Sequence, residues 1–457
     1  MKNIRNKFFQ LLRLAIGTSS EIPDVKYEEW VAIYEMAKKQ SLLGIAFDGI
    51  EKMGNAVRMD SDLLMTWIGR CKQIERRNLQ LNEAVVKVSE YFKKNGFEAC
   101  ILKGQGNALM YPKPLHRTPG DIDIWVSGKD SDVIRFVHSI APDEKASYHH
   151  IDFPAYKGIP IEVHYRPCYL QNLICNKRLQ RFFEERAEEQ FSHRVDGEFG
   201  SFAVPTGHFN VVYQLGHVFG HLFQEGIGLR QILDYYFVVN DFWKVKERFS
   251  KITPSLFTIK EGSTSHLDPL TLRGEGETAP FNSLYDPFGS PCRGQKRRSE
   301  PLRSKVGGPS EVSPDFLTQQ SCDCLCGVNR LADNSLAMED TIIATDALKI
   351  LQRDLKGLGL YGFAGAMMYV LHEVLGLDED MMIVPMDERR GRMLLEEILA
   401  SGNFGQYDER YSFGQGAIGH NLQRLFRDLR LVRYYPAEAL SEPVFRTWHF
   451  LWRKMQK

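Results

Sequence analysis

Two aspartates, Asp121 and Asp123, stand two positions apart in the apolar run Gly120-Asp121-Ile122-Asp123-Ile124-Trp125-Val126. The run predicts a β-strand, and because strand side chains alternate between faces, both carboxylates project from one face while Ile122 and Ile124 point into a core. Carboxylates this close repel each other unless a cation lies between them. The pair therefore favours a Mg²⁺ site, since Mg²⁺ prefers oxygen ligands. A solvent-facing edge strand or a turn is the alternative for an isolated pair, so the surrounding sequence has to distinguish them.

The composition bounds the size and the overall charge of the protein. With 457 residues, the chain is long enough for two or three domains and more than one hydrophobic core. It carries 58 basic and 58 acidic residues, so no overall field recruits nucleic acid or an anionic membrane. Recognition of phosphate groups must therefore be local, and nucleic acid is not an expected partner.

No segment reads as a membrane span. The nearest one, Leu358 to Leu377, contains His372 and Glu373, whereas a spanning helix needs about 20 largely apolar residues. Residues 8–16 are apolar and lie in a basic context like a signal peptide, but Arg13 interrupts them, and we expect an amphipathic helix. Scattered single cysteines fit a reducing compartment. We therefore expect a cytoplasmic protein without a membrane partner. The single cysteines are Cys71, Cys100, Cys168 and Cys175.

The hydrophobic periodicity divides the chain into helical regions around one mixed region. Apolar residues recur every three or four positions before residue 96 and again beyond 178, which predicts helices there. Between them, strands are predicted at 97–102, at the Asp121 motif, at 148–153 and at 159–166. The sequence thus predicts an α+β fold, in which a small mixed-sheet core is flanked by helical regions. The core is residues 96–178, and the helical regions are 1–95, 179–249 and 341–457.

Residues 250–340 break this pattern, because they contain eight prolines and no sustained period. A structureless loop of this length is uncommon inside a compact domain, so we predict a largely disordered insertion that contributes nothing to the site. Cys322, Cys324 and Cys326, with Cys292 upstream, raise the alternative of a zinc site. Ligands at every second position do not match the usual two-residue gap of structural zinc sites.

Two features upstream of the aspartates point to phosphate chemistry. Lys103 and Gly104 end a predicted strand and enter a helix, a turn whose backbone N–H groups can face an anion. Arg117 lies four residues before Asp121 and is a candidate partner of a phosphate oxygen. An ordinary strand-to-helix turn and a surface arginine remain the alternatives for these two features.

Downstream, the segment Ile161-Glu162-Val163-His164-Tyr165-Arg166 repeats the alternation of the first motif. Glu162, His164 and Arg166 share one face of the predicted strand. If this strand neighbours the first, Glu162 completes a carboxylate triad with Asp121 and Asp123, and such a triad can hold two metal ions. Glu162 is then a metal ligand and a candidate base, while His164 and Arg166 are candidate contacts for phosphate or acceptor.

These motifs together resemble the nucleotidyltransferase superfamily with the polymerase-beta-like fold, and within it an uncharacterised bacterial family. The resemblance covers about 30–245 and resumes from about 344. It implies an enzyme that transfers a nucleoside monophosphate from an NTP, with ATP the expected donor, to an acceptor. The reaction is expected to use Mg²⁺, with two ions bound. The residues that carry it are Leu102-Lys103-Gly104, Tyr111, Pro112, Arg117, Asp121-Ile122-Asp123 and Glu162-x-His164.

The resemblance also implies roles residue by residue. Asp121 and Asp123 take the place of the metal-binding pair, and Glu162 that of the third carboxylate. The nucleotide site is expected to contain Lys103, Gly104, Gln105 and Arg117, with Gly104 facing the triphosphate. Two departures, Gln105 in place of Ser or Gly and Glu162 in place of Asp, leave open a second reading. In that reading the protein is a nucleotide-binding or interaction protein with weak catalysis.

The helical half offers further candidates for the acceptor pocket. His217 and His221 stand one helical turn apart and can bind metal or pack together. Asp234 can contact a substrate, or it can pair with Arg230. The segment 402–405 is a plausible turn, with substrate contact as the alternative. The acceptor itself stays open among a small molecule, a sugar and a protein side chain.

Two other enzyme classes share an Asp-x-Asp pair. Haloacid-dehalogenase-like phosphatases want Thr or Val two positions after the second aspartate, where this chain has Trp125. Metal-dependent glycosyltransferases give no reason for the Lys103 turn or the Glu162 strand. Both classes are therefore weaker interpretations than a nucleotidyltransferase.

Overall fold

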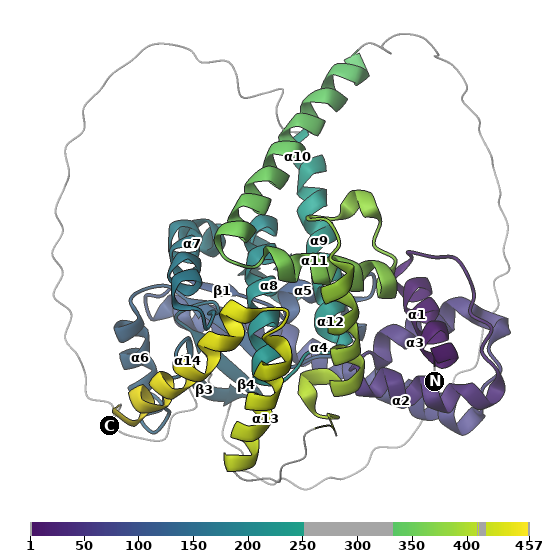
Figure 1. Cartoon of the computed structure of the whole chain (residues 1–457), viewed down its shortest axis with the longest axis horizontal. Coiled ribbons are helices and arrows are strands. Elements are labelled where there is room, and N and C mark those ends of the chain that lie inside the picture. Colours follow the sequence, from purple (N-terminus) through teal and green to yellow (C-terminus); the bar gives the residue numbers. More distant parts are fainter. Residues whose placement is uncertain (1, 251–331, 409, 411–416, 456–457) are drawn as a thin grey trace, which may run out of the picture.

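The computed structural model describes residues 2–250, 332–408, 410 and 417–455, and it shows helices packed around one sheet (Figure 1). The α+β fold predicted from the sequence is confirmed. Ahead of the sheet, the chain forms four α-helices and two short 3₁₀ helices, as predicted for this helical region. These are α1 (Lys2–Ile16), η1 (Tyr27–Glu29), α2 (Trp30–Lys39), α3 (Leu43–Met53), η2 (Gly54–Ala56) and α4 (Ser61–Lys94).

The sheet has six strands in the order β3-β4-β2-β1-β6-β5. Strands β2 and β4 run parallel, as do β1 and β6, while the remaining neighbours are antiparallel. Short helices and two longer ones connect the strands. The segments are β1 (Ala99–Ile101), α5 (Gln105–Ala108), η3 (Pro114–His116), β2 (Ile122–Val126), α6 (Asp130–His138), β3 (His150–Tyr156), β4 (Ile159–His164), α7 (Leu173–Ser192), β5 (Arg194–Gly197) and β6 (Gly200–Ala203).

The prediction of helix alone between 179 and 249 is wrong for the hairpin of β5 and β6, which adds two strands to the sheet through β1. Each strand has only four residues, and Arg194 and Asp196 are exposed at the sheet edge. Short, charged edge strands lack the apolar alternation that identifies a strand in a sequence. Their pairing partner decides their conformation.

One face of the sheet packs against α4. Ile122 and Ile124 of β2 and Val163 of β4 are fully or almost fully buried, in a cluster with Val85 and Phe92 of α4. The 34-residue length of α4 lets this helix cross the sheet, and the side chain of Asp60 caps it by accepting hydrogen bonds from the N–H groups of residues 62 and 63. This face of the sheet therefore forms an apolar core with α4.

The other face of the sheet packs against α7 and α8 (Gly207–Gln224). Trp125 of β2 stacks on Phe209 of α8 with ring centroids 5.6 Å apart, and it contacts Phe191 of α7 at 4.6 Å. Since Asp123 shares the face of Trp125, the strand alternation places its carboxylate under α8. The functional candidates therefore lie between the sheet and a helix.

Helices resume on the far side of the predicted insertion, most of which lies outside the described residues. Helix α9 lies against α10 (Figure 1), and α10 begins before the helical region that was predicted from residue 341. The segments are α9 (Leu229–Ser250), α10 (Ala332–Gly357), α11 (Tyr361–Val370), the π-helix η4 (Leu371–Leu375), η5 (Glu379–Met381), α12 (Glu388–Ser401), η6 (Asn403–Gly405), α13 (Ala417–Leu431) and α14 (Pro436–Met455).

Within the described residues, no single helix is long and apolar enough to cross a membrane. One pair of consecutive helices, Thr345–Gly357 and Tyr361–Leu375, is together long and apolar enough for a membrane span. The chain bends by 117° between these two helices. The residues of the second helix from Phe363 to Val370 are all buried in the protein core.

Gly44 of α3 marks a close contact that holds the N-terminal helices against the core. A Cβ atom at this position would lie 2.2 Å from the carbonyl oxygen of His116, which no side chain tolerates. We expect Gly44→Ala to lower the free energy of unfolding by about 1–3 kcal/mol, because overpacking forces the backbone apart. Urea denaturation followed by circular dichroism measures the change.

Gly69 of α4 supplies the matched control, because a Cβ there meets no atom within 4 Å. Gly69→Ala is expected to raise the free energy of unfolding by roughly 0.5–1 kcal/mol, as alanine is the better helix former. Equal effects of the two substitutions would contradict the close packing of α3 on η3.

Candidate active site

The register of the central strands sets the positions of the acidic residues. Strand β2 runs beside β4 with Asp123 opposite Glu162, so the two predicted strands are neighbours as expected. On the other side of β4, β3 places Asp152 opposite Glu162 and His150 opposite His164. Carboxylates and imidazoles from three adjoining strands are thereby brought to one face of the sheet.

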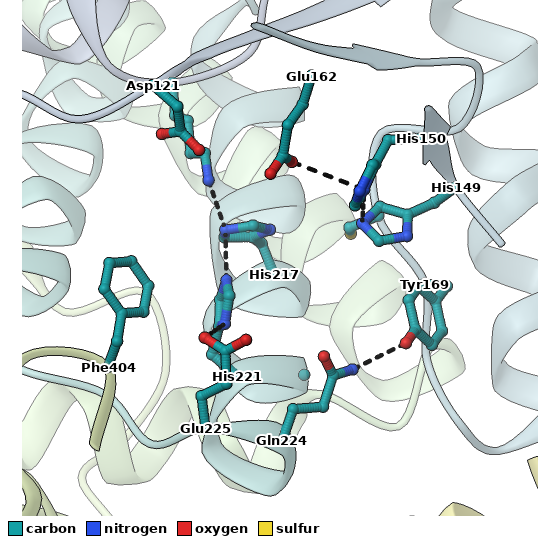
Figure 2. A pocket seen from close by; sticks show the side chains of 13 residues that line it. Asp121, His149, His150, Glu162, Tyr169, His217, His221, Gln224, Glu225 and Phe404 are labelled. Carbon is teal, nitrogen blue, oxygen red and sulfur yellow. Dashed lines mark hydrogen bonds and ion pairs between the residues drawn. The ribbon is translucent and has the colours of Figure 1, made fainter. Parts of the chain in front are cut away.

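A cavity of about 290 Å³ lies between this face and α8. Figure 2 shows Asp121 and Glu162 at its sheet side and His217 and His221 of α8 facing them. Lys103 also lines the cavity. Asp123 lies deeper, with 2 % of its surface exposed, so its carboxylate is reached through the neighbouring groups.

Lys103 joins the sheet to the helix. Its Nζ lies 3.0 Å from Asp123 Oδ1 and 3.1 Å from Nε2 of His217. Burial alone would lower the pKa of Lys103, but the carboxylates of Asp123, Asp121 and Glu162 outweigh it and raise the pKa above its ordinary value. Lys103 is therefore a fixed cation at the cavity wall.

His164 is the second cation beside Asp123. Its Nε2 lies 3.1 Å from Asp123 Oδ1 and 3.5 Å from Glu162 Oε2, and its side chain is fully buried. Burial lowers the pKa of His164, yet the hydrogen bonds to the two carboxylates raise it overall to about 9. In turn, Lys103 and His164 hold the pKa of Asp123 below its ordinary value against the effect of its own burial.

The pKa values of the two aspartates are shifted in opposite directions. The charge of Asp123 is the main cause that raises the pKa of Asp121, and burial adds to it. Asp123 keeps its charge because two cations touch it, whereas Asp121 lies at the cavity with less compensation. A cation placed between them would remove this asymmetry.

Three overlapping groups in the described residues bring three candidate metal ligands within 4.8 Å of one another. They are His149, His150 and His164; Asp123, Glu162 and His164; and His150, Asp152 and Glu162. Asp121 lines the cavity but is not in any of these compact groups. Of the predicted carboxylate triad, Asp123 and Glu162 are therefore close together, and Asp121 stands at the cavity mouth beside them.

In the turn after β1, Lys103 lines the cavity, whereas Gly104 and Gln105 do not. Gly104 has φ +64°, a left-handed conformation that suits glycine, and it lies near the backbone of Asp121. The Gln105 side chain points away from the cavity, where it donates a hydrogen bond to Asn82 of α4. The departure at Gln105 therefore leaves the cavity wall unchanged.

Three further predicted residues do not line the cavity. Arg117 and Asp234 form a buried ion pair, in which Nε and Nη2 of the arginine lie 2.7 and 2.8 Å from the two carboxylate oxygens. Arg166 donates a hydrogen bond to Asp130 and lies over the ring of Tyr148. The predicted roles of these residues in phosphate or acceptor contact thus have no support from their positions.

A line of polar contacts follows α8 along the cavity (Figure 2). His217 Nε2 lies 3.0 Å from His221 Nε2, and His221 Nδ1 lies 3.5 Å from Glu225 Oε2. Burial lowers the pKa of His217 well below its ordinary value, so its ring is neutral. Contact with His221 lowers the pKa of Glu225, which therefore stays ionised.

Several residues of the cavity were missed in the sequence. Glu225 stands one helical turn beyond His221, and this spacing was the available signal. His149 and His150 are an adjacent pair at the beginning of β3, but only the folded sheet brings them to Glu162. Phe404 belongs to the segment 402–405, for which substrate contact was the alternative, and its ring lies 5.3 Å from that of His221.

The mixed sheet, its neighbouring acidic strands and the lysine beside them fit the nucleotidyltransferase class. The model of a family described as uncharacterised nucleotidyltransferases matches residues 26–249. Over this segment the match confirms the resemblance to a nucleotidyltransferase family found in the sequence. No curated protein and no solved structure matches the chain. The resumption of the resemblance from about 344 stays a prediction.

Proposed function

We propose that the protein transfers a nucleoside monophosphate from an NTP, with ATP the expected donor, to a small-molecule, sugar or protein acceptor. The observation that carries the proposal is the pairing of Asp123 with Glu162 across β2 and β4, beside Lys103 and a cavity. The family match supports the same reaction class. The nature of the acceptor is not part of the proposal.

The residues present fit Mg²⁺. Asp123 Oδ2 is buried and has no hydrogen-bond partner among the described residues, while Asp121 and Glu162 offer further oxygens at the adjoining cavity. An all-oxygen donor set of this kind suits Mg²⁺, which shares its shell with substrate phosphates. Asp121, Asp123 and Glu162 would hold the ion, which when bound neutralises charge on the phosphates.

The chain's own residues divide the rest of the reaction between the two cavity walls. The Lys103 ammonium has three donors, and Asp123 and His217 take two of them, which leaves one for a phosphate oxygen. The acceptor oxygen bonds to the α-phosphorus, the bond to the bridging oxygen breaks, and pyrophosphate leaves with the electron pair. His221 takes the proton of the acceptor at Nδ1, because its Nε2–H donates to Nε2 of His217, and the Glu225 carboxylate beside Nδ1 stabilises the imidazolium that forms.

The experiment uses the full chain with each radiolabelled NTP in turn, Mg²⁺ and a cell extract as the source of acceptors. We expect nucleotidyl label on an acceptor with one NTP and none when the metal is chelated. An Asp→Asn variant of the exposed Asp196 in β5 is the control and should label normally. Absence of label with every NTP would contradict the proposal.

A second candidate, a nucleotide-binding protein with weak catalysis, is favoured by one observation. Lys103 and His164 already balance the negative charge of Asp123, so this carboxylate does not need a metal ion to compensate it. Saturable Mg²⁺-dependent binding of an NTP without any transfer of label would favour this candidate over the enzyme.

His221→Gln separates the acceptor side of the cavity from the nucleotide side. We expect kcat for transfer to fall by about 10²-fold, because a positioned base contributes roughly 10²–10⁴-fold, while the NTP dissociation constant stays unchanged. Steady-state kinetics and equilibrium binding measure the two quantities. His138→Gln is the matched control, since His138 of α6 bonds to the carbonyl oxygen of Glu144 on the surface. If His221→Gln weakened NTP binding by as large a factor as it lowered kcat, that result would contradict a role of His221 on the acceptor side.

A further inference from the structure

Three histidine rings converge beside the carboxylates at the sheet. His149 and His150 stand at the beginning of β3, and His164 ends β4 opposite His150. Their ring centroids are 4.4 Å apart for His149 and His150, and 5.3 Å from each of these to His164. One nitrogen of each ring lies within 4.8 Å of the other two.

The hydrogen bonds of these rings are incomplete. His164 Nε2 faces the Asp123 carboxylate at 3.1 Å, but its Nδ1 is buried without a hydrogen-bond partner among the described residues. His149 Nδ1 is also buried without a hydrogen-bond partner among the described residues. A buried ring nitrogen usually has a partner, because leaving one unsatisfied costs about 1–3 kcal/mol. The unpartnered Nδ1 of His164 is therefore open to a ligand, whereas Nδ1 of His149 is not the ring nitrogen that faces His150.

The geometry of the cluster matches that of a transition-metal site. His149 Nε2 and His150 Nδ1 are 3.1 Å apart, and two nitrogens bound to one tetrahedral Zn²⁺ at 2.0–2.1 Å would be roughly 3.3 Å apart. The contact of His164 with Asp123 is the carboxylate–histidine arrangement that orients metal-bound imidazoles. Glu162 Oε2, 3.6 Å from His150 Nδ1, is available as an oxygen ligand next to the rings.

We propose that His149, His150 and His164 form a binding site for a divalent transition-metal ion of the Zn²⁺ type, which adjoins the Mg²⁺ site at Asp121 and Asp123 and has Glu162 at the border between the two. Imidazole nitrogens suit such ions, whereas Mg²⁺ selects oxygens. The ion binds Nδ1 of His164 in place of the proton that this nitrogen carries in the metal-free ring, and that proton is released to solvent. His149 and His150 line the cavity, so a ligand in the cavity can reach the ion. The site does not depend on nucleotidyl transfer, because its binding can be measured without any NTP.

The test uses the full chain, freed of metal with a chelator, in a Cys292→Ser, Cys322→Ser, Cys324→Ser, Cys326→Ser background that removes the thiols of the alternative zinc site. Isothermal titration with Zn²⁺ alone should give one tight equivalent, and Co²⁺ should give the visible absorption of a low-symmetry nitrogen and oxygen site. His149→Gln and His150→Gln should each weaken Zn²⁺ binding by more than about 100-fold, since even the loss of an outer-shell partner costs 10–100-fold.

Two further variants keep the test independent of folding and of the proposed reaction. His138→Gln, the matched surface control, should bind Zn²⁺ normally, and thermal unfolding of each metal-free variant checks its fold. Asp121→Asn should keep the Zn²⁺ site and lose nucleotidyl transfer, so failure of the transfer assay leaves this proposal standing. Unchanged Zn²⁺ binding in both His149→Gln and His150→Gln, or no tight equivalent in the parent, would overturn it and leave the 3.1 Å contact as a hydrogen bond between two rings.

Discussion

Asp123→Asn is expected to lower the rate of nucleotidyl transfer by roughly 10²–10³-fold, the usual cost of removing one group that stabilises the transition state. The amide keeps the shape of the carboxylate but removes its charge, so the groups that now face Asp123 lose the anion they hold. Lys103 and His164 are those groups, at 3.0 and 3.1 Å. Initial rates with the labelled NTP and its acceptor measure the effect.

Asp196→Asn is the control for this substitution, because Asp196 lies on the exposed edge strand β5 and makes the same change of charge far from the cavity. Circular dichroism and the unfolding midpoint show whether the Asp123 variant folds. A folded Asp123→Asn protein with an ordinary rate of transfer would exclude the carboxylate from the reaction. A variant that binds NTP normally in Mg²⁺ but transfers nothing would place its role in the chemical step.

The sequence predicts the sheet side of the site well, because strand alternation is a local property. The period of two puts Asp121 and Asp123 on one face and Ile122 and Ile124 on the other without knowledge of any neighbour. The pairing of β2 with β4 was a hypothesis at that level, and the structure confirms it through the register of Asp123 and Glu162. The alternation of side chains and the family resemblance therefore both identify β2 and β4 as the strands of the site.

The helix side of the site is harder to predict, since it depends on which face of α8 turns toward the sheet. Trp125 packs on Phe209, and this contact fixes the rotation that aims His217 and His221 at Lys103. A packed histidine pair was one of the two interpretations of the sequence. No feature of the neighbouring sequence distinguishes such a pair from one that lines a cavity. Arg117 was assigned to phosphate for the same lack of information, because its partner Asp234 lies 117 residues away.

The ion pair of Arg117 and Asp234 has a second expected consequence, for stability. The exposed fractions of the two residues are 3 % and 5 %, and Tyr111 adds a hydrogen bond from its hydroxyl to Asp234 Oδ1 at 2.6 Å. Asp234→Ala leaves the guanidinium buried without its counter-charge, so we expect the free energy of unfolding to fall by about 3–5 kcal/mol. Asp346→Ala, which breaks only an exposed pair with Lys349, should change it by less than about 1 kcal/mol.

The same pair gives stability a defined dependence on pH. Burial would raise the pKa of Asp234, but Arg117 outweighs it and holds the pKa below the ordinary value. The folded protein therefore binds the Asp234 proton less tightly than the unfolded chain, whose aspartates titrate near about 3.9. The contribution of the pair is complete above that pH and is lost as the pH falls through the lower folded value.

Urea denaturation at pH 7 and at a series of pH values below 5 measures both effects. In the parent protein the free energy of unfolding should decline across the acid range, and in Asp234→Ala the part of the decline due to this residue should disappear. Arg117→Met combined with Asp234→Leu should recover most of the stability at pH 7, because two apolar side chains avoid the buried lone charge. If the double variant were as unstable as Asp234→Ala, the loss would come from packing between α9 and the segment that joins η3 to β2, and the ion pair would not be its cause.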